Sequence, residues 1–330
     1  MEFDIYNPHA NKNVTADYVE IIRKSLEMAG HSTREIDKPI KSKANLQRGI
    51  VCIQASTTRL AKRCKYGKII RWVQGAGEAE SYMRHHSKLR YLVLSALNYY
   101  AFCCCDFVIF CSQTMKTYYE KRFHKSFKHS YIMPCFNDEI KKEVYFTDGK
   151  YADNIFTYAG SLDVWQCFEP TVALYREVEK QTDNTLFRVL TKDKEAAENI
   201  LKKYGVQRYS IGFVPKEQVA DEMAKAKFGF CIREDSIVNR VATPTKLSSY
   251  VANGVMPIYS EYIEDFHNLA KNSKYCFCAN PEFDSQVVEK LVAACNKDIS
   301  ANDVFSEYTE IFGNYYSKAF HAEMLTELLK

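Results

Sequence analysis

The sequence predicts an α/β protein built from two doubly wound domains, each with a parallel sheet between helices. Its 330 residues are about twice the usual domain length, which favours two domains over one. Short runs rich in β-branched and aromatic residues alternate with helical segments almost throughout, as in strands joined by crossover helices. Hydrophobic residues make up 46% and charged residues 26%, which excludes a disordered or collagen-like chain.

The first half contains strand-like runs separated by helical segments. The predicted strands are Phe3–Tyr6, Ile50–Gln54, Ile69–Val73, Phe107–Cys111 and Ser130–Met133. Val14–Ala29 carries apolar residues at helical spacing and is followed by Gly30, a residue suited to the left-handed turn after a helix. Ser112 is suited to cap the helix that follows the fourth strand, because its hydroxyl can accept a bond from the first turn.

The second half repeats this alternation. The predicted strands are Ile155–Tyr158, Leu186–Leu190, Tyr209–Ile211, Phe228–Ile232, Val255–Tyr259 and Tyr275–Cys278. Helices near Asp303–Phe312 and Tyr315–Leu329 close the chain. Residues 136–150 are charged and lack a persistent period, which predicts a linker there. We therefore expect an N-terminal domain over residues 1–145 and a C-terminal domain over residues 146–313.

The net charge of +4 hides a strong asymmetry between the halves. Residues 1–150 carry 25 Lys and Arg against 15 Asp and Glu, whereas residues 151–330 carry 20 against 26. The basic clusters 59–68 and 121–128 mix cations with apolar side chains, which suits the surface of an anionic membrane. A merely solvated face is the alternative for each cluster. A nucleic-acid partner is not expected, because no recognisable nucleic-acid-binding motif accompanies the basic patches.

Several features predict a cytoplasmic protein, with a peripheral position on the inner face of the membrane. The apolar stretch 91–110 contains Asn98 and ends in a predicted strand, so we expect no transmembrane helix. The N-terminus lacks the basic and apolar regions of a secretory signal. The twelve cysteines include no Cys-x2-Cys pair, which favours reduced core residues and no metal site.

The segment from Arg233 to Gly254 is the most informative. A predicted strand ends at Arg233, and after a polar loop Thr243 and Pro244 provide an N-cap and a first helical residue. The backbone N–H groups of Thr245 and Lys246 would be open to an anion, and Lys246 adds a full charge, so a diphosphate fits here. An ordinary capped helix with a surface lysine is the alternative.

At this helix the sequence resembles a known family. Pro244-Thr-Lys-Leu-Ser-Ser-Tyr-Val-Ala-Asn-Gly-Val-Met-Pro-Ile258 is similar to the donor-binding helix of GT-B glycosyltransferases, particularly family 4 and its relatives of bacterial surface polysaccharide biosynthesis. Further segments resemble the family in the same order: Leu26–His31, Arg71–Gly75 with Glu80, Asp106–Ser112, Tyr158–Asp163 and Gly212–Pro215. The resemblance implies two Rossmann-like domains facing a central cleft, with the C-terminal helix 314–330 returning to the N-terminal domain.

The sequence departs from the family at one important place. The family usually keeps two glutamates eight positions apart, the second in contact with the ribose of the donor. This chain has Ser249 and, eight residues earlier, Val241 at those places. A serine hydroxyl bonds a ribose more weakly than a carboxylate does. Glu234, Asp235 or Asn239 on the preceding loop are alternatives for reaching the transferred sugar.

The resemblance and the residue chemistry together give the candidate site. Cations and backbone N–H groups would stabilise the charge that develops on the leaving diphosphate. The expected donor-binding residues are Gly160, Ser161, Arg188, Lys192, Arg233, Asn239, Thr243, Thr245, Lys246 and Ser249. Glu80 is the first candidate for the base that deprotonates the acceptor, with His85 or His86 as the second and Glu234 as a further catalytic candidate on the donor side. On the acceptor side we expect Asn7, His9 and Gly75.

The function implied is transfer of a sugar from a UDP- or GDP-sugar to a lipid-linked or glycan acceptor, in capsule, O-antigen or exopolysaccharide assembly. The resemblance implies retention of anomeric configuration without a metal or other cofactor, and the sequence contains no Asp-x-Asp motif. Two alternatives stay open: a non-catalytic homologue that binds nucleotide or glycan, and a sugar-nucleotide 2-epimerase.

Overall fold

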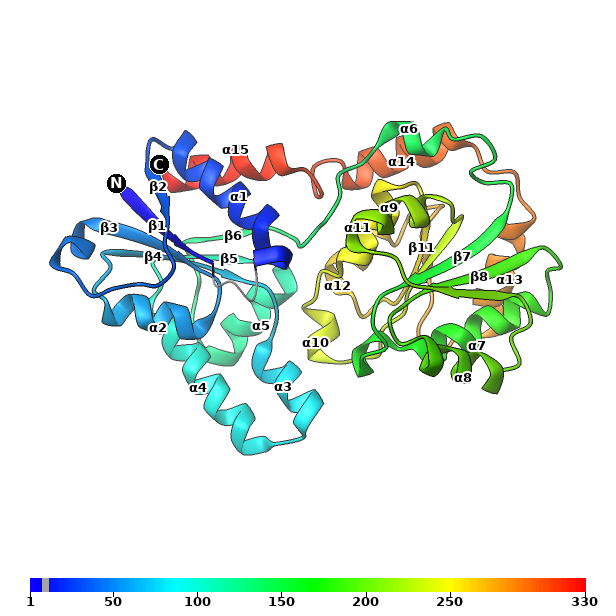
Figure 1. Ribbon diagram of the computed structural model, residues 1–330, viewed down its shortest axis with the longest axis horizontal. Helices are drawn as coiled ribbons and strands as arrows, with labels where there is room; N and C mark the ends of the chain where they lie inside the picture. The colour runs from blue at the N-terminus through cyan, green and yellow to red at the C-terminus, as the bar shows by residue number, and fades with distance from the viewer. Residues whose placement is uncertain (8–11) are drawn as a thin grey trace. The chain divides into compact units, whose positions relative to one another are not determined.

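The computed structural model describes residues 1–7 and 12–330 and divides into two compact units (Figure 1). Unit 1 comprises residues 1–135 and 317–330, and unit 2 comprises residues 136–316. Each unit contains a six-stranded sheet, and the strand pairs are parallel. The prediction of two doubly wound α/β domains is therefore confirmed.

The sheet of unit 1 has the order β2-β1-β3-β4-β5-β6. Its strands are β1 (Glu2–Tyr6), β2 (Ser32–Glu35), β3 (Arg48–Cys52), β4 (Lys68–Val73), β5 (Phe107–Phe110) and β6 (Ser130–Ile132). The central strands are almost fully buried, as expected for parallel strands covered by helices on both faces. The sequence analysis missed β2, a short polar edge strand whose side chains are mostly exposed.

Two layers of helices cover this sheet. The helices of unit 1 are α1 (Lys12–Met28), α2 (Ala55–Arg63), α3 (Gly77–His85), α4 (Lys88–Cys104), α5 (Gln113–Phe123) and α15 (Lys318–Leu329), with a short 3-10 helix η2 (Lys43–Gln47). Figure 1 shows α1 and α15 on one face of the sheet and α2, α4 and α5 on the other. Gly30, with φ of +83°, follows α1, and the Ser112 hydroxyl accepts a 2.9 Å bond from the Met115 N–H at the start of α5. Both expected helix boundaries are confirmed.

The sheet of unit 2 has the order β12-β11-β10-β7-β8-β9. Its strands are β7 (Asn154–Ala159), β8 (Thr185–Leu190), β9 (Tyr209–Gly212), β10 (Phe228–Cys231), β11 (Met256–Tyr259) and β12 (Phe277–Cys278). All six coincide with predicted strands to within a few residues. The chain runs outward from β7 to β9 and then returns to add β10 beside β7, so the direction of winding reverses between these two strands.

The helices of unit 2 separate these strands along the chain. They are α6 (Lys142–Tyr145), α7 (Phe168–Glu179), α8 (Lys194–Lys203), α9 (Lys216–Ala224), α10 (Ile237–Arg240), α11 (Thr245–Ala252), α12 (Glu264–Ala270), α13 (Ser285–Cys295) and α14 (Ala301–Phe312), with a 3-10 helix η3 (Val164–Gln166). Helix α11 is buried along most of its length and ends at Asn253 and Gly254, as predicted.

The segment 136–150, predicted as a linker, packs against unit 2 instead. Tyr145 is fully buried, and its hydroxyl donates to the Val251 carbonyl. The Lys141 N–H donates to the carbonyl of Ala252 at 3.1 Å, and the buried Lys150 ammonium donates to backbone carbonyls. The chain therefore passes from unit 1 to unit 2 at Cys135. The sequence analysis predicted a linker from the charged composition of this segment and missed the buried Tyr145 ring that packs it against unit 2.

The C-terminal helix α15 returns to unit 1, as the resemblance implied. Leu325 and Leu329 on α15 are buried, and the Leu329 carbonyl lies 3.1 Å from the imidazole Nε2 of His31. Lys318 forms an ion pair with Asp17 of α1 at 2.8 Å. These contacts hold α15 against α1 and make the end of the chain part of the first unit.

The structure also bears on the membrane and on the cysteines. Within residues 1–7 and 12–330, no helix combines the length and apolarity needed to cross a bilayer. All twelve cysteines lie among the described residues and are free thiols.

Candidate functional site

A cavity of about 650 Å³ lies in unit 2 at the carboxyl ends of β7, β8 and β9. The loops after these strands form part of its wall, and the first turn of α11 forms another part. Ligands of open α/β sheets bind at this edge, next to the reversal of winding. Six of the residues predicted to bind the donor line this cavity, which we call the donor cavity after that prediction: Gly160, Ser161, Lys192, Thr245, Lys246 and Ser249.

Lys246 is the principal cation of the donor cavity. Its ammonium lies 3.9 Å from the centre of the Tyr158 ring and donates a 2.7 Å hydrogen bond to the side-chain oxygen of Gln166. Desolvation lowers the pKa of Lys246 to about 7, and the nearby positive charge of Arg233 acts in the same direction. No carboxylate in the described part of the chain forms an ion pair with Lys246. The cavity therefore presents a cation that lacks an anionic partner.

Gly160 allows the chain to pass close to this lysine. Its φ of +143° lies in a region that favours glycine, and a Cβ there would lie 2.9 Å from Cε of Lys246. The Tyr158 hydroxyl donates a 2.6 Å bond to the Ser161 carbonyl and holds the following turn. The glycine predicted from the turn after the first strand of this unit therefore lies directly beside the cation.

The start of α11 corrects one prediction. Thr243 does not cap the helix, because α11 begins at Thr245 and Pro244, with extended ψ of 122°, occupies the cap position. No side chain caps this helix start, so its first N–H groups are not satisfied by a cap. The helix dipole adds partial positive charge at the same place, close to Lys246.

A carboxylate lies beside Ser249 that the sequence analysis did not identify. The Ser249 hydroxyl donates a 3.0 Å bond to Oδ2 of Asp138, and the Asn137 N–H donates to the Ser248 hydroxyl at 3.2 Å. Asn137 itself lines the donor cavity. Val241, at the place of the family's other glutamate, is fully buried and offers no polar atom. Only tertiary packing brings Asp138, far away in sequence, to Ser249 of α11.

An apolar wall of the donor cavity was also missed. It is formed by Phe213 and Val214, which follow β9, and by Val219 and Met223 on α9. The Lys192 ammonium lies 5.3 Å from the centre of the Phe213 ring. The exposed Phe213, an aromatic residue directly after a strand, is the sequence signal that could have identified this wall.

Five predicted site residues of unit 2 do not line the donor cavity: Arg188, Arg233, Glu234, Asn239 and Thr243. Arg188 forms an ion pair with Glu222 at 3.4 Å. The amide of the buried Asn239 donates to the backbone carbonyl of Glu234 at 3.0 Å, so it holds its own loop. The buried Arg233 donates to the backbone carbonyls of Gln166 and of the preceding Ile232, and its charge lies near Lys246.

A second cavity, of about 680 Å³, lies in unit 1 at the carboxyl ends of β3 and β4, and we call it the unit 1 cavity. Two predicted residues, Gly75 and Glu80, line it. A Cβ on Gly75 would overlap the Glu80 carboxylate, so the glycine makes room for this side chain. Burial raises the pKa of Glu80, and the neighbouring Arg84 opposes this shift. A carboxylate with a raised pKa is a stronger base, which suits proton abstraction.

The unit 1 cavity also contains polar residues that were not predicted. Arg71 is buried, and its guanidinium lies 4.6 Å from the centre of the Phe102 ring. Glu78 accepts hydrogen bonds from Asn98 at 3.1 Å and from the Tyr119 hydroxyl at 3.2 Å. A charged residue within an otherwise apolar strand is the signal by which Arg71 could have been identified.

The remaining candidates of unit 1 lie outside this cavity. His85 and His86 are exposed at the end of α3, where His86 adopts a left-handed conformation as the cap. Asn7 accepts a 2.9 Å bond from Thr15, and Thr15 lines the cavity. His9 lies outside the described residues.

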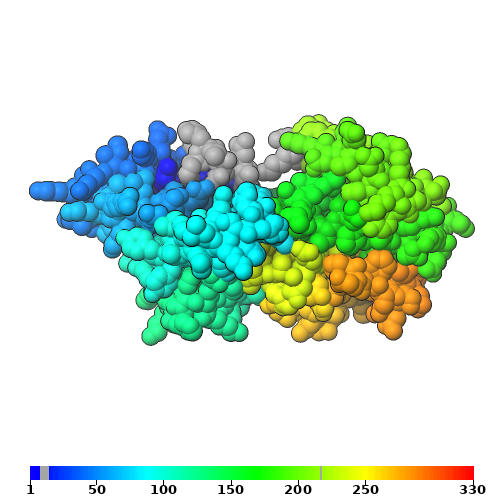
Figure 2. All heavy atoms as spheres, turned by 90° about the horizontal axis from the view of Figure 1, so that it is seen from below, coloured from blue at the N-terminus to red at the C-terminus, as the bar shows by residue number. Residues whose placement is uncertain are grey.

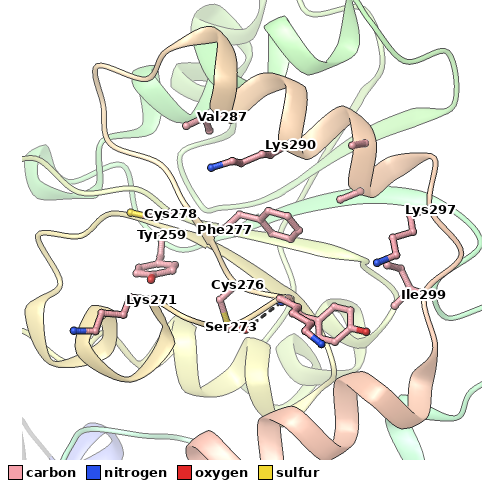
Figure 3. Close-up of a pocket in the computed structure, with 14 residues that line it drawn as sticks. Tyr259, Lys271, Ser273, Cys276, Phe277, Cys278, Val287, Lys290, Lys297 and Ile299 are labelled. Atoms are coloured by element: carbon pink, nitrogen blue, oxygen red, sulfur yellow. Dashed lines mark hydrogen bonds between the residues drawn. The ribbon is translucent and has the colours of Figure 1, made fainter.

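A third cavity, of about 480 Å³, lies in unit 2 between the edge strand β12 and α13 (Figure 3). Four lysines surround it: Lys271, Lys274, Lys290 and Lys297. None of the predicted site residues contributes to it. The described residues include no group of three or more His, Cys, Asp or Glu side chains placed to hold a metal ion.

Comparisons with known proteins give structural matches only. No family model and no curated protein matches the sequence. Sucrose-phosphate synthase from Thermosynechococcus elongatus matches with a TM-score of 0.71 and 10% identity, over 99% of this chain and 98% of its own. WaaG, a glycosyltransferase involved in lipopolysaccharide biosynthesis, matches with a TM-score of 0.62 and 14% identity, over 100% and 99%.

TarM from S. aureus, solved with UDP, matches with a TM-score of 0.65 and 9% identity over 87% of this chain. The chain spans only 56% of the length of TarM, but nearly the whole length of the other two proteins. Identities this low establish a shared fold. The chain thus has the two-domain, Rossmann-like GT-B fold of these glycosyltransferases.

Proposed function

We propose that this protein is a glycosyltransferase that moves a sugar from a nucleoside-diphosphate sugar to a saccharide acceptor. The observation that carries the proposal is the donor cavity, where the unpaired Lys246, the uncapped start of α11 and Gly160 face the same space. A diphosphate supplies the negative charge that this arrangement lacks. Two solved structures of the same fold are named as glycosyltransferases, and two others contain UDP or a UDP-sugar.

The donor has a defined place in this proposal. The diphosphate binds at Lys246 and the first turn of α11, and the nucleobase packs against the apolar wall at Phe213. Asp138, held by Ser249, supplies the carboxylate that accepts bonds from the ribose hydroxyls. This residue replaces the glutamate that the family carries at the position of Ser249. UDP and GDP are the two donor nucleotides to compare.

The transfer step requires a base on the acceptor side. The bond from the anomeric carbon to the diphosphate oxygen breaks, and the leaving diphosphate takes the electron pair beside Lys246. The acceptor oxygen forms the new bond, and its proton passes to the carboxylate of Glu80. Following the sequence resemblance, we propose retention of configuration and no metal, with surface-polysaccharide assembly as the setting.

Helix α4 favours an acceptor carried by a lipid. Its exposed face carries Leu89, Leu92, Val93, Tyr99 and Tyr100, with exposed fractions from 45% to 73%. This helix lies on the surface seen in Figure 2, where it is coloured cyan. The basic cluster 121–128 adjoins it, since Tyr99 contacts Phe123 with ring centres 5.2 Å apart. Apolar side chains flanked by cations fit the interface of an anionic membrane.

Nucleotide binding tests the donor site directly. We expect UDP or GDP at 100 times its Kd to stabilise the protein by about 2.7 kcal/mol, measured as a rise in unfolding temperature. The variant Lys246→Ala loses this response because the diphosphate loses its cation. Lys202→Ala, which removes an exposed lysine of α8 far from the cavity lining, keeps it. No response of the wild-type protein to either nucleotide would refute the proposed donor site.

A non-catalytic homologue that binds nucleotide is the second candidate. Ser249 and the buried Val241 stand where the family has glutamates, and this observation favours it. The two functions differ in turnover: a transferase releases UDP or GDP from its donor when an acceptor is supplied, whereas a binding protein does not. Asp138→Asn tests the donor site under either function, because loss of donor affinity in that variant shows that Asp138 compensates for the missing carboxylates.

A further inference from the structure

The unit 1 cavity contains a buried cation that the transfer step above does not use. Arg71 projects from β4 and is 5% exposed, and it lines the cavity together with Arg59 of α2. Nε and Nη1 of Arg71 have no hydrogen-bond partner. Neither arginine forms an ion pair with any carboxylate of residues 1–7 and 12–330. Arginine remains charged in proteins, so a positive charge is buried here without an ion-pair partner.

The acidic residues of the cavity compensate this charge only in part: the Glu78 carboxylate acts to raise the pKa of Arg71, but it does not form an ion pair with the guanidinium. Glu78 uses one carboxylate oxygen for Asn98 and Tyr119, and its other oxygen has no partner. Glu80 faces Gly75. A buried charge without an ion-pair partner destabilises the free protein, and a bound anion or ordered water would reduce this cost. The cavity is large enough for a monosaccharide derivative.

The start of α2 adds a third positive element. Ala55 and Ser56, the first residues of α2, line the same cavity. The side chains of Gln54 and Thr57 form a capping box, in which the Gln54 side chain accepts from the Thr57 N–H. The other N–H groups of the first turn have no such side-chain partner among the described residues. The guanidinium groups of Arg71 on β4 and Arg59 on α2 thus line the same cavity as the N-terminus of α2, a helix of nine residues.

We propose that the unit 1 cavity binds a phosphate monoester on the acceptor saccharide, and that Arg71 and Arg59 contact this phosphate. A dianionic phosphate can interact with both guanidinium groups and with the start of α2 at once, which a carboxylate with two oxygens does less completely. Naming the ligand an acceptor rests on the proposed transferase function, whereas binding of the phosphate does not. The acceptor class is therefore a phosphorylated sugar, free or linked to a lipid.

The test uses glucose 6-phosphate as the probe, titrated into protein already saturated with UDP so that the donor cavity is filled. We expect binding of glucose 6-phosphate, and none of glucose, by isothermal titration calorimetry. Arg59→Gln and Arg71→Gln each weaken binding by at least about tenfold, because a charged partner is lost. Arg63→Gln, which removes the same charge from the exposed end of α2, changes it less than about twofold.

A second arm separates the two sources of the phosphate. Phosphatidylcholine vesicles with and without phosphatidylinositol 4-phosphate are sedimented with the same variants. One supporting outcome is binding to the vesicles that contain phosphatidylinositol 4-phosphate without binding of glucose 6-phosphate. If Arg59→Gln loses this vesicle binding and Arg63→Gln keeps it, the phosphate belongs to a lipid-linked acceptor. Affinity for both probes that is the same in wild type and Arg59→Gln overturns it, even if Arg71→Gln misfolds.

The outcomes also separate this proposal from the transferase function. If the wild-type protein fails to bind UDP but binds glucose 6-phosphate through Arg59, the phosphate site stands and the transferase assignment fails. If UDP binds through Lys246 while neither phosphate probe binds, the donor site stands and the phosphate site is refuted.

Discussion

At the scale of single residues, the ammonium of Lys246 makes donor binding depend on pH. Its pKa is lowered to about 7 from the 10.5 of a solvated lysine because the group is desolvated. A bound diphosphate favours the charged form, so above pH 7 binding must take up a proton. We expect the affinity for UDP-glucose to fall by up to about tenfold per pH unit from about pH 7 to about pH 9. Calorimetry in buffers of different ionisation enthalpy measures both affinity and proton uptake.

The control is Lys246→Arg, whose guanidinium stays charged throughout this range. We expect its affinity to be nearly constant with pH, and a wild-type affinity equally constant would contradict the role of Lys246. The pH dependence of the stability of the free protein is an independent test of the lowered pKa of Lys246. Between about pH 7 and the unfolded-state pKa near 10.5, the unfolded chain binds more protons, so this lysine makes stability increase with pH.

Gly160 provides a second residue-scale prediction. A methyl group at Gly160 would press on Lys246 and would strain a backbone with φ of +143°. We expect Gly160→Ala to lower UDP affinity by at least about tenfold, since it displaces the Lys246 ammonium that binds the diphosphate. Gly205→Ala is the matched control, because Gly205 also has positive φ, +69°, but nothing lies near its Cβ position. We expect both variants to lose similar stability, whereas only Gly160→Ala loses UDP affinity. Calorimetry measures both quantities.

At the scale of elements, the exposed face of α4 predicts membrane binding. Replacing Leu89 and Leu92 by serine removes two side chains with exposed fractions of 73% and 62%. Burying such a side chain in the membrane interface contributes about 1.5–3 kcal/mol, so we expect a loss of at least about tenfold in partitioning to vesicles that contain phosphatidylglycerol. Vesicle sedimentation measures this loss, and nucleotide binding is unchanged.

The matched control for α4 is Leu328→Ser on α15, where the leucine is 50% exposed but belongs to another surface. Binding that is lost equally in this control would indicate non-specific adhesion. Binding that is insensitive to salt and to lipid charge would exclude a role for the basic clusters 59–68 and 121–128.

At the scale of the whole molecule, α15 joins the end of the chain to unit 1. Leu325 is fully buried against this unit, whereas Leu328 three residues later is 50% exposed. We expect Leu325→Ala to lower the free energy of unfolding by about 2–5 kcal/mol, as large-to-small changes in a core do. Leu328→Ala changes it by about 0.5 kcal/mol or less. Denaturant unfolding of both variants measures the difference, and equal effects would contradict the packing of α15.

The architecture was largely predictable because it follows from local patterns. Buried parallel strands such as β5 are short apolar runs between polar segments, and the sequence shows them directly. Strand β2 was missed because Ser32–Glu35 lies at an edge, is mostly exposed and has no apolar pattern. The segment 136–150 was misassigned because one buried residue, Tyr145, outweighs its charged composition.

The candidate site was predictable only where its residues share one segment. Thr245, Lys246 and Ser249 belong to one short helix, and a motif identified them together. Asp138 and Gln166 contact the same helix from distant parts of the chain, and neither has a local signal. Arg188 showed the reverse: the sequence analysis predicted that it binds a phosphate, but it forms an ion pair with Glu222 on α9.

The amino-acid sequence by itself determined the two parallel sheets and the segment that carries Lys246, because strand periodicity and helix starts depend on neighbouring residues. Only the tertiary structure decided which charges are satisfied. Arg188 acquired an ion-pair partner, while Lys246 and Arg71 were buried without one among the described residues. The physical reason is that the energy of a charge depends on desolvation and on partners brought from elsewhere in the fold, and a linear pattern contains neither.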